Sequence, residues 1–346
     1  MSSTIGKIQW GIGFIPKYRQ RILSSTFPSI KHFKGVNLVE KLPLHNSSYR
    51  RKKWAKVDAG EDAFFNLSTP YGGYIGVADG VGGWEDVGVD SSHFSWTLMT
   101  NCNDILKEKL SLNDYNITHN PTPQQLLDLS YKRLIDSKKV MAGSSTASIV
   151  QFDKVNSLLN TCNLGDSGYI IIRNFNQIIY KSKPMHHFFN CPYQLSLSPE
   201  NAKRGLDSSD SVNDSQTSQH KLYPNDLVIV ATDGLFDNLF DEETLSIVQN
   251  EFINISPNMG DSYSNSIHFS NNDNYDPTLL AGDSRLDQKV RKLAQKLTDT
   301  ARRLSYNKKR MSPWAQYAIE NGYPEEIGGK VDDITVLVAL VQPTAE

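Results

Sequence analysis

The chain has 346 residues, a formal net charge of −2 and a hydrophobic content of 38%. That length suits one large domain or two small ones, and the near-neutral charge speaks against nucleic acid as the main partner. Its three cysteines, Cys102, Cys162 and Cys191, form no CxxC pair, so neither a disulfide framework nor a zinc site is expected. No uninterrupted apolar run is long enough to span a bilayer, so no transmembrane segment is predicted.

The N-terminal arm, residues 1–45, differs from the rest because it has no Asp or Glu before Glu40. Lysine, arginine and serine are spread through it, a composition typical of a mitochondrial transit peptide. Ile8, Ile12 and Ile15 would share the apolar face of a helix, which Pro16 would interrupt. The arm therefore predicts a mitochondrial location, in the matrix, with a disordered basic tail as the alternative.

Short apolar runs and helical patterns follow from about Lys53 onward. Strands are expected at residues 63–67, 74–78, 147–152, 158–164, 169–174, 177–181, 227–231 and 334–341. Several of these runs are only a few residues apart, which favours antiparallel hairpins over parallel crossovers.

Helical patterns begin near Ser91 or Ser92, at Thr122, and at Ser284, where apolar residues recur at steps of three and four as far as Ser305. Thr122 and Gln125 have the spacing of a capping box. Two polar segments, near 206–220 and 256–283, are interpreted as mobile insertions. Strand pairs with amphipathic helices predict an α+β fold rather than a regularly alternating, doubly wound sheet.

Acidic residues recur where apolar runs begin or end. The four pairs are Glu61-Asp62, Asp79-Gly80, Asp233-Gly234 and Asp332-Asp333. One Asp-Gly step is usually a turn, but a strand that ends at Asp79, beside an antiparallel strand that begins at Asp332, puts both carboxylates at one rim. Asp233 and Glu61 can reach the same rim. Carboxylate oxygens suit Mg²⁺ or Mn²⁺, and two such ions can activate a shared water for phosphate-ester hydrolysis.

These pairs also belong to a longer series of motifs. Between them lie Gly143-Ser144-Ser145-Thr146-Ala147 and Asn163-Leu164-Gly165-Asp166-Ser167-Gly168. In this order, from about residue 57 to 341, the motifs resemble those of the metal-dependent type 2C protein phosphatases. The segments 76–84, 90–92 and 191–196 are similar to the mitochondrial branch of that family.

The resemblance implies an αββα sandwich, two packed antiparallel sheets flanked by helices, with residues 46–346 as the phosphatase domain. It also implies two ions, Mg²⁺ or Mn²⁺, in the active site. Asp79 would bridge both ions and their water, Gly80, Asp233 and Asp332 would hold the first ion, Glu61 would hold the second, and Asp166 matches an aspartate linked to a weaker third. These ligands would be held in position by Asp62, Thr146 and Asp333, which would not bind an ion themselves.

Two positions depart from the family pattern. Val81 stands where many members carry a histidine proposed to protonate the leaving alkoxide, and Val57 stands where many carry an arginine that grips phosphate. Protonation would then fall to a metal-bound water. Arg51, Lys53 and Lys56 stay open as alternatives for the base that grips phosphate.

The leading hypothesis is a monomeric protein-serine/threonine phosphatase, a hydrolase that acts on phosphoprotein substrates. One alternative is a catalytically weak or inactive phosphatase-fold protein with a binding or regulatory role, suggested by Val57 and Val81. Another is a different two-metal phosphoesterase, such as a nuclease, against which the near-neutral charge speaks.

Overall fold

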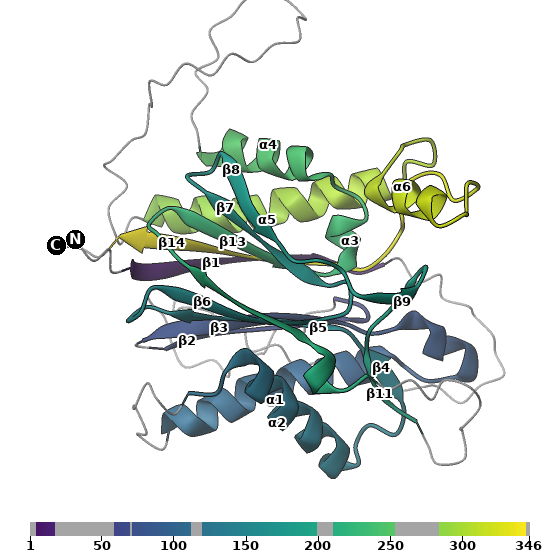
Figure 1. Ribbon diagram of the computed structural model, residues 1–346, viewed down its shortest axis with the longest axis horizontal. Helices are drawn as coiled ribbons and strands as arrows, with labels where there is room; N and C mark the ends of the chain where they lie inside the picture. Colours follow the sequence, from purple (N-terminus) through teal and green to yellow (C-terminus); the bar gives the residue numbers. More distant parts are fainter. Residues whose placement is uncertain are drawn as a thin grey trace, which may run out of the picture.

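Two antiparallel sheets pack face to face, and helices cover both outer sides (Figure 1). This computed structural model describes residues 5–17, 59–69, 71–111, 120–198, 210–252 and 284–343. The αββα sandwich predicted from the sequence is therefore confirmed. The expected insertion near 256–283, Val57 and the three candidate phosphate bases Arg51, Lys53 and Lys56 lie outside the described residues.

The first sheet has the strand order β1-β14-β13-β7-β8. Its strands are β1 (Ile5–Ile15), β14 (Ile334–Pro343), β13 (Asp226–Ala231), β7 (Gly168–Arg173) and β8 (Gln177–Lys181). Helices α4 (Asp241–Phe252) and α5 (Ser284–Ser305) cover its outer face (Figure 1). The apolar stripe of α5 is buried on this sheet from Leu286 to Ala301, as its periodicity predicts.

The second sheet has the strand order β12-β6-β5-β3-β2. Its strands are β12 (Gln216–Lys221), β6 (Leu158–Leu164), β5 (Ala147–Asp153), β3 (Gly72–Asp79) and β2 (Asp62–Thr69). Helices α1 (Ser92–Ser111) and α2 (Pro123–Ser137) cover its outer face (Figure 1). Thr122 and Gln125 form the predicted capping box of α2, with the Gln125 N–H donating to Thr122 Oγ1 at 3.2 Å.

Smaller elements join the sheets and line one rim of the sandwich. They are the 3₁₀ helices η1 (Gly82–Val87) and η4 (Val212–Asp214), the paired strands β4 (Gly143–Ser145) and β11 (Leu195–Leu197), the paired strands β9 (His186–Phe188) and β10 (Cys191–Pro192), and helices α3 (Asp233–Phe236) and α6 (Pro313–Glu320). No helix in the described part of the chain is both long enough and apolar enough to cross a membrane.

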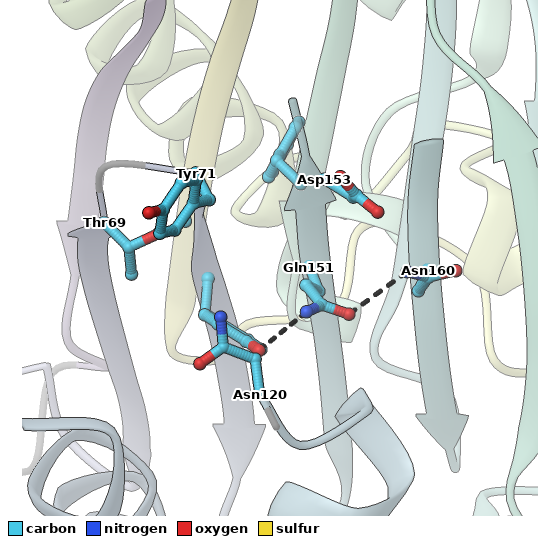
Figure 2. Close-up of a pocket in the computed structure, with 9 residues that line it drawn as sticks. Thr69, Tyr71, Asn120, Gln151, Asp153 and Asn160 are labelled. Carbon is cyan, nitrogen blue, oxygen red and sulfur yellow. Dashed lines mark hydrogen bonds between the residues drawn. The ribbon is translucent and has the colours of Figure 1, made fainter. Parts of the chain in front are cut away.

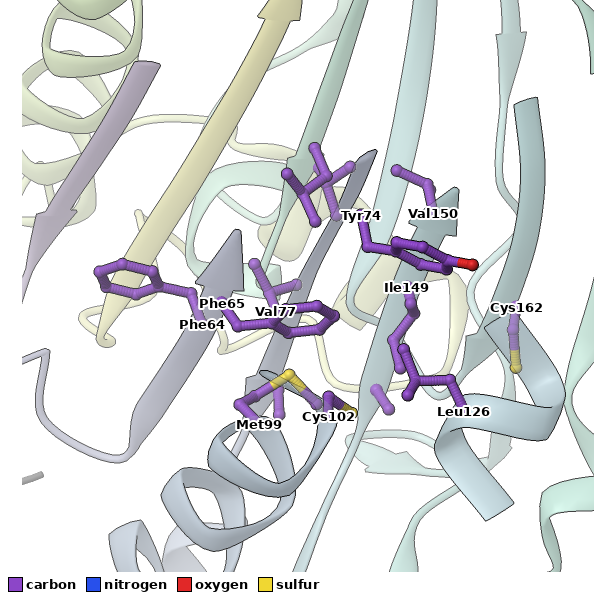
Figure 3. Close-up of a cluster of buried hydrophobic side chains, with 14 of the residues drawn as sticks. Phe64, Phe65, Tyr74, Val77, Met99, Cys102, Leu126, Ile149, Val150 and Cys162 are labelled. Carbon is purple, nitrogen blue, oxygen red and sulfur yellow. The ribbon is translucent and has the colours of Figure 1, made fainter. Parts of the chain in front are cut away.

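The main core lies between the two sheets and under α1 and α2. Figure 3 shows Phe65 and Val77 of the second sheet beside Met99 and Cys102 of α1. A second cluster fills the space between the first sheet and helices α4 and α5. Both faces of each central strand are therefore buried, which explains why β3, β13 and β14 read as continuous apolar runs.

The polar segment near 206–220 was expected to be a mobile loop, and this prediction is wrong for its described part. Residues 216–221 form β12, which pairs along its length with β6, from Gln216 opposite Asn163 to Lys221 opposite Leu158. The strand lies at the sheet edge with most of its side chains exposed or half-buried, so burial imposes no apolar alternation on its sequence.

The N-terminal arm also differs from the expectation, because its first part is a strand of the domain and not a helix. β1 pairs with β14 from Ile5 to Ile15, and Ile5 and Ile8 are buried. Gly13 faces α5 so closely that a Cβ atom there would lie 2.6 Å from the Ala294 carbonyl oxygen. The boundary predicted at residue 45 therefore does not separate residues 5–17 from the domain.

This close approach predicts that Gly13→Ala destabilises the protein, because the added methyl group forces β1 and α5 apart. We expect the free energy of unfolding to fall by about 1–3 kcal/mol, measured by urea denaturation. Gly83→Ala is the matched control, since a Cβ atom at Gly83 has nothing within 4 Å. Equal stability of the two variants would contradict the packing of β1 described above.

Candidate metal centre

The predicted carboxylates meet at one end of the sandwich, where strands of both sheets begin or end. β2 pairs with β3 so that Asp62 lies directly opposite Asp79, and Glu61 comes just before β2. On the other sheet, Asp233 starts α3 directly beyond β13, and Asp332 lies two residues before β14. The sequence predicted Asp79 and Asp332 on neighbouring strands, but β3 and β14 belong to different sheets. The cluster therefore forms across the sandwich.

Electrostatics shows that these carboxylates act on one another. Burial raises the pKa of Asp79 well above its ordinary value, and the carboxylates of Asp233, Asp62 and Asp332 raise it further. Burial also raises the pKa of Asp62, and Asp333 adds to the effect. Such mutual repulsion is the expected state of a carboxylate cluster that is built to bind cations.

The backbone of Asp79 is held by the segment that contains the Ser-Ser-Thr motif. The Asp79 N–H donates to Thr146 Oγ1 at 3.1 Å, and the Thr146 N–H donates to the Asp79 carbonyl at 2.9 Å. The Ser145 hydroxyl donates to the same carbonyl at 2.8 Å, and Thr146 Oγ1 lies 2.8 Å from Ser167 Oγ. Thr146 therefore fixes the position from which the Asp79 side chain leaves the strand.

Glu61 is held by hydrogen bonds to its side chain and its backbone. The hydroxyl of Ser91 donates to Glu61 Oε1, and that of Ser95 donates to the Glu61 carbonyl at 2.5 Å. The Glu61 N–H donates to Asp333 Oδ2 at 2.7 Å, and the Gly80 N–H donates to the Glu61 carbonyl at 3.2 Å. Asp333 thus links the loop before β14 to the start of β2, in the other sheet.

A second link between the sheets involves Asp62. The Thr232 hydroxyl donates to Asp62 Oδ2 at 2.9 Å and accepts from the Thr335 N–H at 3.1 Å. Gly234 lies against the Asp333 carbonyl, where a Cβ atom would clash. The loops that carry Asp233 and Asp332 are therefore packed directly together, which brings the two carboxylates to the same rim.

Two cations that the sequence reasoning missed lie among these carboxylates. The Lys330 ammonium group donates to Asp233 and to Asp237 Oδ2, the latter at 2.8 Å, and lies 3.3 Å from Asp332 Oδ2. Burial lowers the pKa of Lys330, but Asp233, Asp237 and Asp332 outweigh that effect and hold it well above its ordinary value. Lys330 is therefore a half-buried cation whose charge is stabilised by its carboxylate neighbours.

Lys17, directly after Pro16 at the end of β1, is the second cation. Its backbone N–H donates to Asp333, and its ammonium group lies 3.6 Å from Asp332 Oδ1. The Lys17 side chain is 44% exposed, against 17% for Lys330, so Lys17 is the more accessible of the two cations.

Asp166 lies beside the cluster and is paired with His186. His186 Nε2 is 3.1 Å from Asp166 Oδ2, and the His186 ring stacks on Tyr317 with centroids 5.3 Å apart. His187 points elsewhere, with its Nε2 3.0 Å from Asp210, as expected for adjacent residues of an extended segment. The two histidines therefore do not form a metal-binding pair.

Trp84 joins η1 to the neighbouring segments of the rim. The Trp84 Nε1–H donates to Ser144 Oγ at 2.7 Å, and Ser144 donates to Gln194 Oε1 at 2.6 Å. These bonds fasten η1 to β4 and to the segment before β11. His93 is the second residue of α1 and is half-buried.

The carboxylate oxygens at the rim suit a hard divalent cation, although the side chains are not arranged around a common point. Among the described residues, no three Asp, Glu, His or Cys side chains enclose a point where an ion would sit, and Lys330 lies between three of the carboxylates. Asp233 Oδ1 and Asp166 Oδ1 are nevertheless buried without a hydrogen-bond partner. Buried, unpaired carboxylate oxygens of this kind are suitable ligands for Mg²⁺ or Mn²⁺.

A polar pocket at the opposite end of β3 is a separate feature. Gln151 and Asn160 line it together with Tyr74, and the Gln151 amide donates to Tyr74 Oη at 2.7 Å (Figure 2). Gly73 of this pocket lies six residues from Asp79 along β3, roughly 20 Å at the usual rise of a strand. The pocket therefore takes no part in the carboxylate cluster.

Asp237 carried a signal that sequence reasoning could have used. It follows Asp233 by four residues and lies directly after α3, so both side chains face the same side of this short helix. Lys330 and Lys17 carried no comparable signal, because a lysine near an acidic pair is ordinarily a surface residue.

Comparison with known proteins gives a consistent result, although no family model matches the chain. It is 35% identical over 282 residues to "Protein phosphatase PTC7 homolog" of Homo sapiens, covering 82% of this chain and 79% of that protein. The Danio rerio protein of the same name is 36% identical, with 82% and 81% covered. Among solved structures, the photosystem II phosphatase PBCP shares the fold, with a TM-score of 0.64, 24% identity, and 97% and 99% of the two chains covered.

The raised pKa values predict that the metal-free protein loses stability as pH rises. Burial raises the pKa of Asp333 to about 6 and that of Asp237 to about 7. The folded protein then keeps protons that the unfolded chain has released, so the free energy of unfolding falls from about pH 4 to about pH 7 and levels off above that.

Urea unfolding in EDTA at several pH values measures this effect. Asp237→Asn removes the titration near neutral pH and should flatten the curve above about pH 6. A wild-type curve that is flat or rises over the same range would show that the cluster is not strained by its own charge.

Proposed function

The chain belongs to the type 2C metal-dependent protein phosphatases, with the PTC7 proteins as its relatives, and we propose that it works with two Mg²⁺ or Mn²⁺ ions held at the carboxylate rim. It is a protein-serine/threonine phosphatase, and its substrates are phosphoproteins. One observation carries the proposal. Carboxylates from the ends of both sheets, above all Asp79, Asp233 and Asp332, form a single electrostatic cluster, and Asp233 Oδ1 is buried without a partner.

In the proposed centre, Asp79 lies between the two ion sites. Asp233, Asp332 and the Gly80 carbonyl complete the first site, and Glu61 serves the second. Support comes from the pKa of Asp79, which Asp233 and Asp332 both raise, and from the bonds that fix Glu61 beside the Gly80 backbone. When bound, such ions would polarise the phosphate and lower the pKa of a coordinated water.

The other residues of the proposed centre hold the ligands in position. Thr146 fixes the backbone of Asp79, Asp62 fastens Thr232 next to Asp233, and Asp333 holds the Glu61 N–H. These three contacts pre-organise carboxylates from two sheets before any ion arrives, so less ordering remains to be done on binding. Lys17 joins Arg51, Lys53 and Lys56 as a candidate for the base that grips phosphate.

The inactive, purely binding alternative is not favoured, because the relatives are named phosphatases and the carboxylate set is complete. Neither Val81 nor Val57 removes a proposed metal ligand. The near-neutral net charge of −2 speaks against the nuclease alternative.

We expect Asp79→Asn to abolish most of the activity. The asparagine side chain has one uncharged oxygen and an NH₂ group, and these cannot bridge two divalent ions. Phosphate release from a phosphoserine peptide in Mn²⁺ should fall about a thousandfold or more. The variant should still fold, since it removes charge from a repelling cluster.

The exposed Asp136 of α2 offers a matched control, and Asp136→Asn should keep wild-type activity. Near-normal, manganese-dependent turnover by folded Asp79→Asn would refute the bridging role.

A mitochondrial matrix location is part of the proposal and rests on the basic, acid-free arm. Because β1 belongs to the first sheet, cleavage anywhere between Ile5 and Lys17 would cut into that strand or take it away. We therefore expect residues 1–45 to direct import into mitochondria and β1 to stay attached to the imported protein.

A fluorescent reporter fused to residues 1–45 tests the predicted location. We expect the reporter in mitochondria, because the inside-negative membrane potential draws basic residues inward. Mass spectrometry of the imported full chain should find the residues of β1 retained. A cytosolic reporter would contradict the location, whereas an imported protein cut within β1 would contradict only the second expectation.

A further inference from the structure

The side chain of Lys330 lies among the carboxylates of the rim. Its ammonium group contacts one carboxylate oxygen each of Asp233, Asp237 and Asp332. Asp166 is a further electrostatic neighbour of Lys330 and of Asp237. A positive charge with three or four carboxylates around it has the surroundings of a bound cation, although here the cation is covalently part of the chain.

The ammonium group is held in this place by its own backbone and by an aromatic ring. The Lys330 N–H donates to Asn238 Oδ1 at 3.0 Å, and the Asn238 amide donates back to the Lys330 carbonyl at 2.8 Å. The same amide donates to the Gly234 carbonyl at 3.0 Å. The Trp314 ring centre lies 4.8 Å from Lys330 Nζ, which stabilises the charge from another side.

The surroundings leave two buried carboxylate oxygens open to cations, of which Asp233 Oδ1 serves the proposed first ion and Asp166 Oδ1 serves neither proposed ion. Asp166 Oδ1 and Asp233 Oδ1 are buried and unpartnered. Asp237 and Asp166 are not among the ligands proposed for the two ions, yet both lie near enough to act on each other's charge. Asp233, Asp237 and Asp166 would therefore make a further divalent site if the Lys330 ammonium group were absent.

We propose that the ammonium group of Lys330 takes the place of an additional divalent cation, so that the centre binds two metal ions and excludes a third. The proposal rests on the proposed function, because it presupposes the two-ion centre. Its physical basis is occupancy: the ammonium group already binds Asp233 and Asp237, the two carboxylates that a further divalent ion would share, whereas Asp233 Oδ1 stays open to the first ion. The expectation that Asp166 holds a weak third ion is the competing outcome.

The number of ions bound decides between these outcomes without any measurement of activity. Mn²⁺ binding to the full chain would be followed by calorimetry, with free Mn²⁺ counted by electron paramagnetic resonance. We expect two ions for the wild type up to millimolar Mn²⁺, and a third for Lys330→Met. Lys181→Met is the matched control, because Lys181 is paired with Asp241 outside the rim at 2.6 Å, and it should bind two.

The double variant Lys330→Met/Asp237→Asn should return to two ions, because the added site loses a ligand. Lys330→Gln, which keeps a neutral donor, serves if Lys330→Met fails to fold with three carboxylates left unpaired. Three ions in the wild type, or two in both folded Lys330 variants, would overturn the proposal while the two-ion centre stands. No saturable binding by any variant would instead refute the proposed function itself.

Discussion

Asp79 and Asp233 come from different sheets, yet burial and the nearby Asp233 carboxylate together raise the pKa of Asp79 well above its ordinary value. This repulsion among buried carboxylates is the constraint on which the rest of the rim depends. Folding brings like charges together in a region of low dielectric, so each one must be matched by a cation or remain protonated. The Lys330 and Lys17 side chains meet part of this requirement, and divalent ions would meet the remainder.

The bonds that position the ligands are also the bonds that join the two sheets. Thr232 with Asp62, and Asp333 with Glu61, link residues separated by 170 and 272 positions in the chain. Asp333 also accepts from the Lys17 N–H at the end of β1. A disturbance of the packing between the sheets should therefore reach the centre directly, because the same side chains serve stability and ligand geometry. β1 is accordingly a structural part of the centre, although the sequence placed it in an N-terminal arm outside the domain.

Hydrophobic periodicity predicted the buried elements well, because burial on both faces leaves a clear pattern. The expected strand at 158–164 matches β6, and the helix from Ser284 to Ser305 matches α5. The pattern failed at two edge strands, β12 and β1, although it predicted the other two, β2 and β8. β12 is largely solvent-exposed, and β1 has the alternation of an edge strand mixed with glycines that serve the approach of α5. Edge strands are specified by their partner's hydrogen bonds, which leave little trace in composition.

The sequence by itself determined the kind of chemistry, because the acidic pairs at the ends of apolar runs have the oxygen donors and the order typical of type 2C phosphatases. Periodicity determined most of the buried strands and three helices, whereas the arrangement in two packed sheets was implied by the resemblance to that family. Only the tertiary structure decided that Asp79 and Asp332 meet across the sandwich, that Asp237 joins them, and that Lys330 and Lys17 lie among the carboxylates. The physical reason is that these contacts join segments far apart in the chain, and a charged residue's partner depends on how the loops pack, a property that no local spacing records.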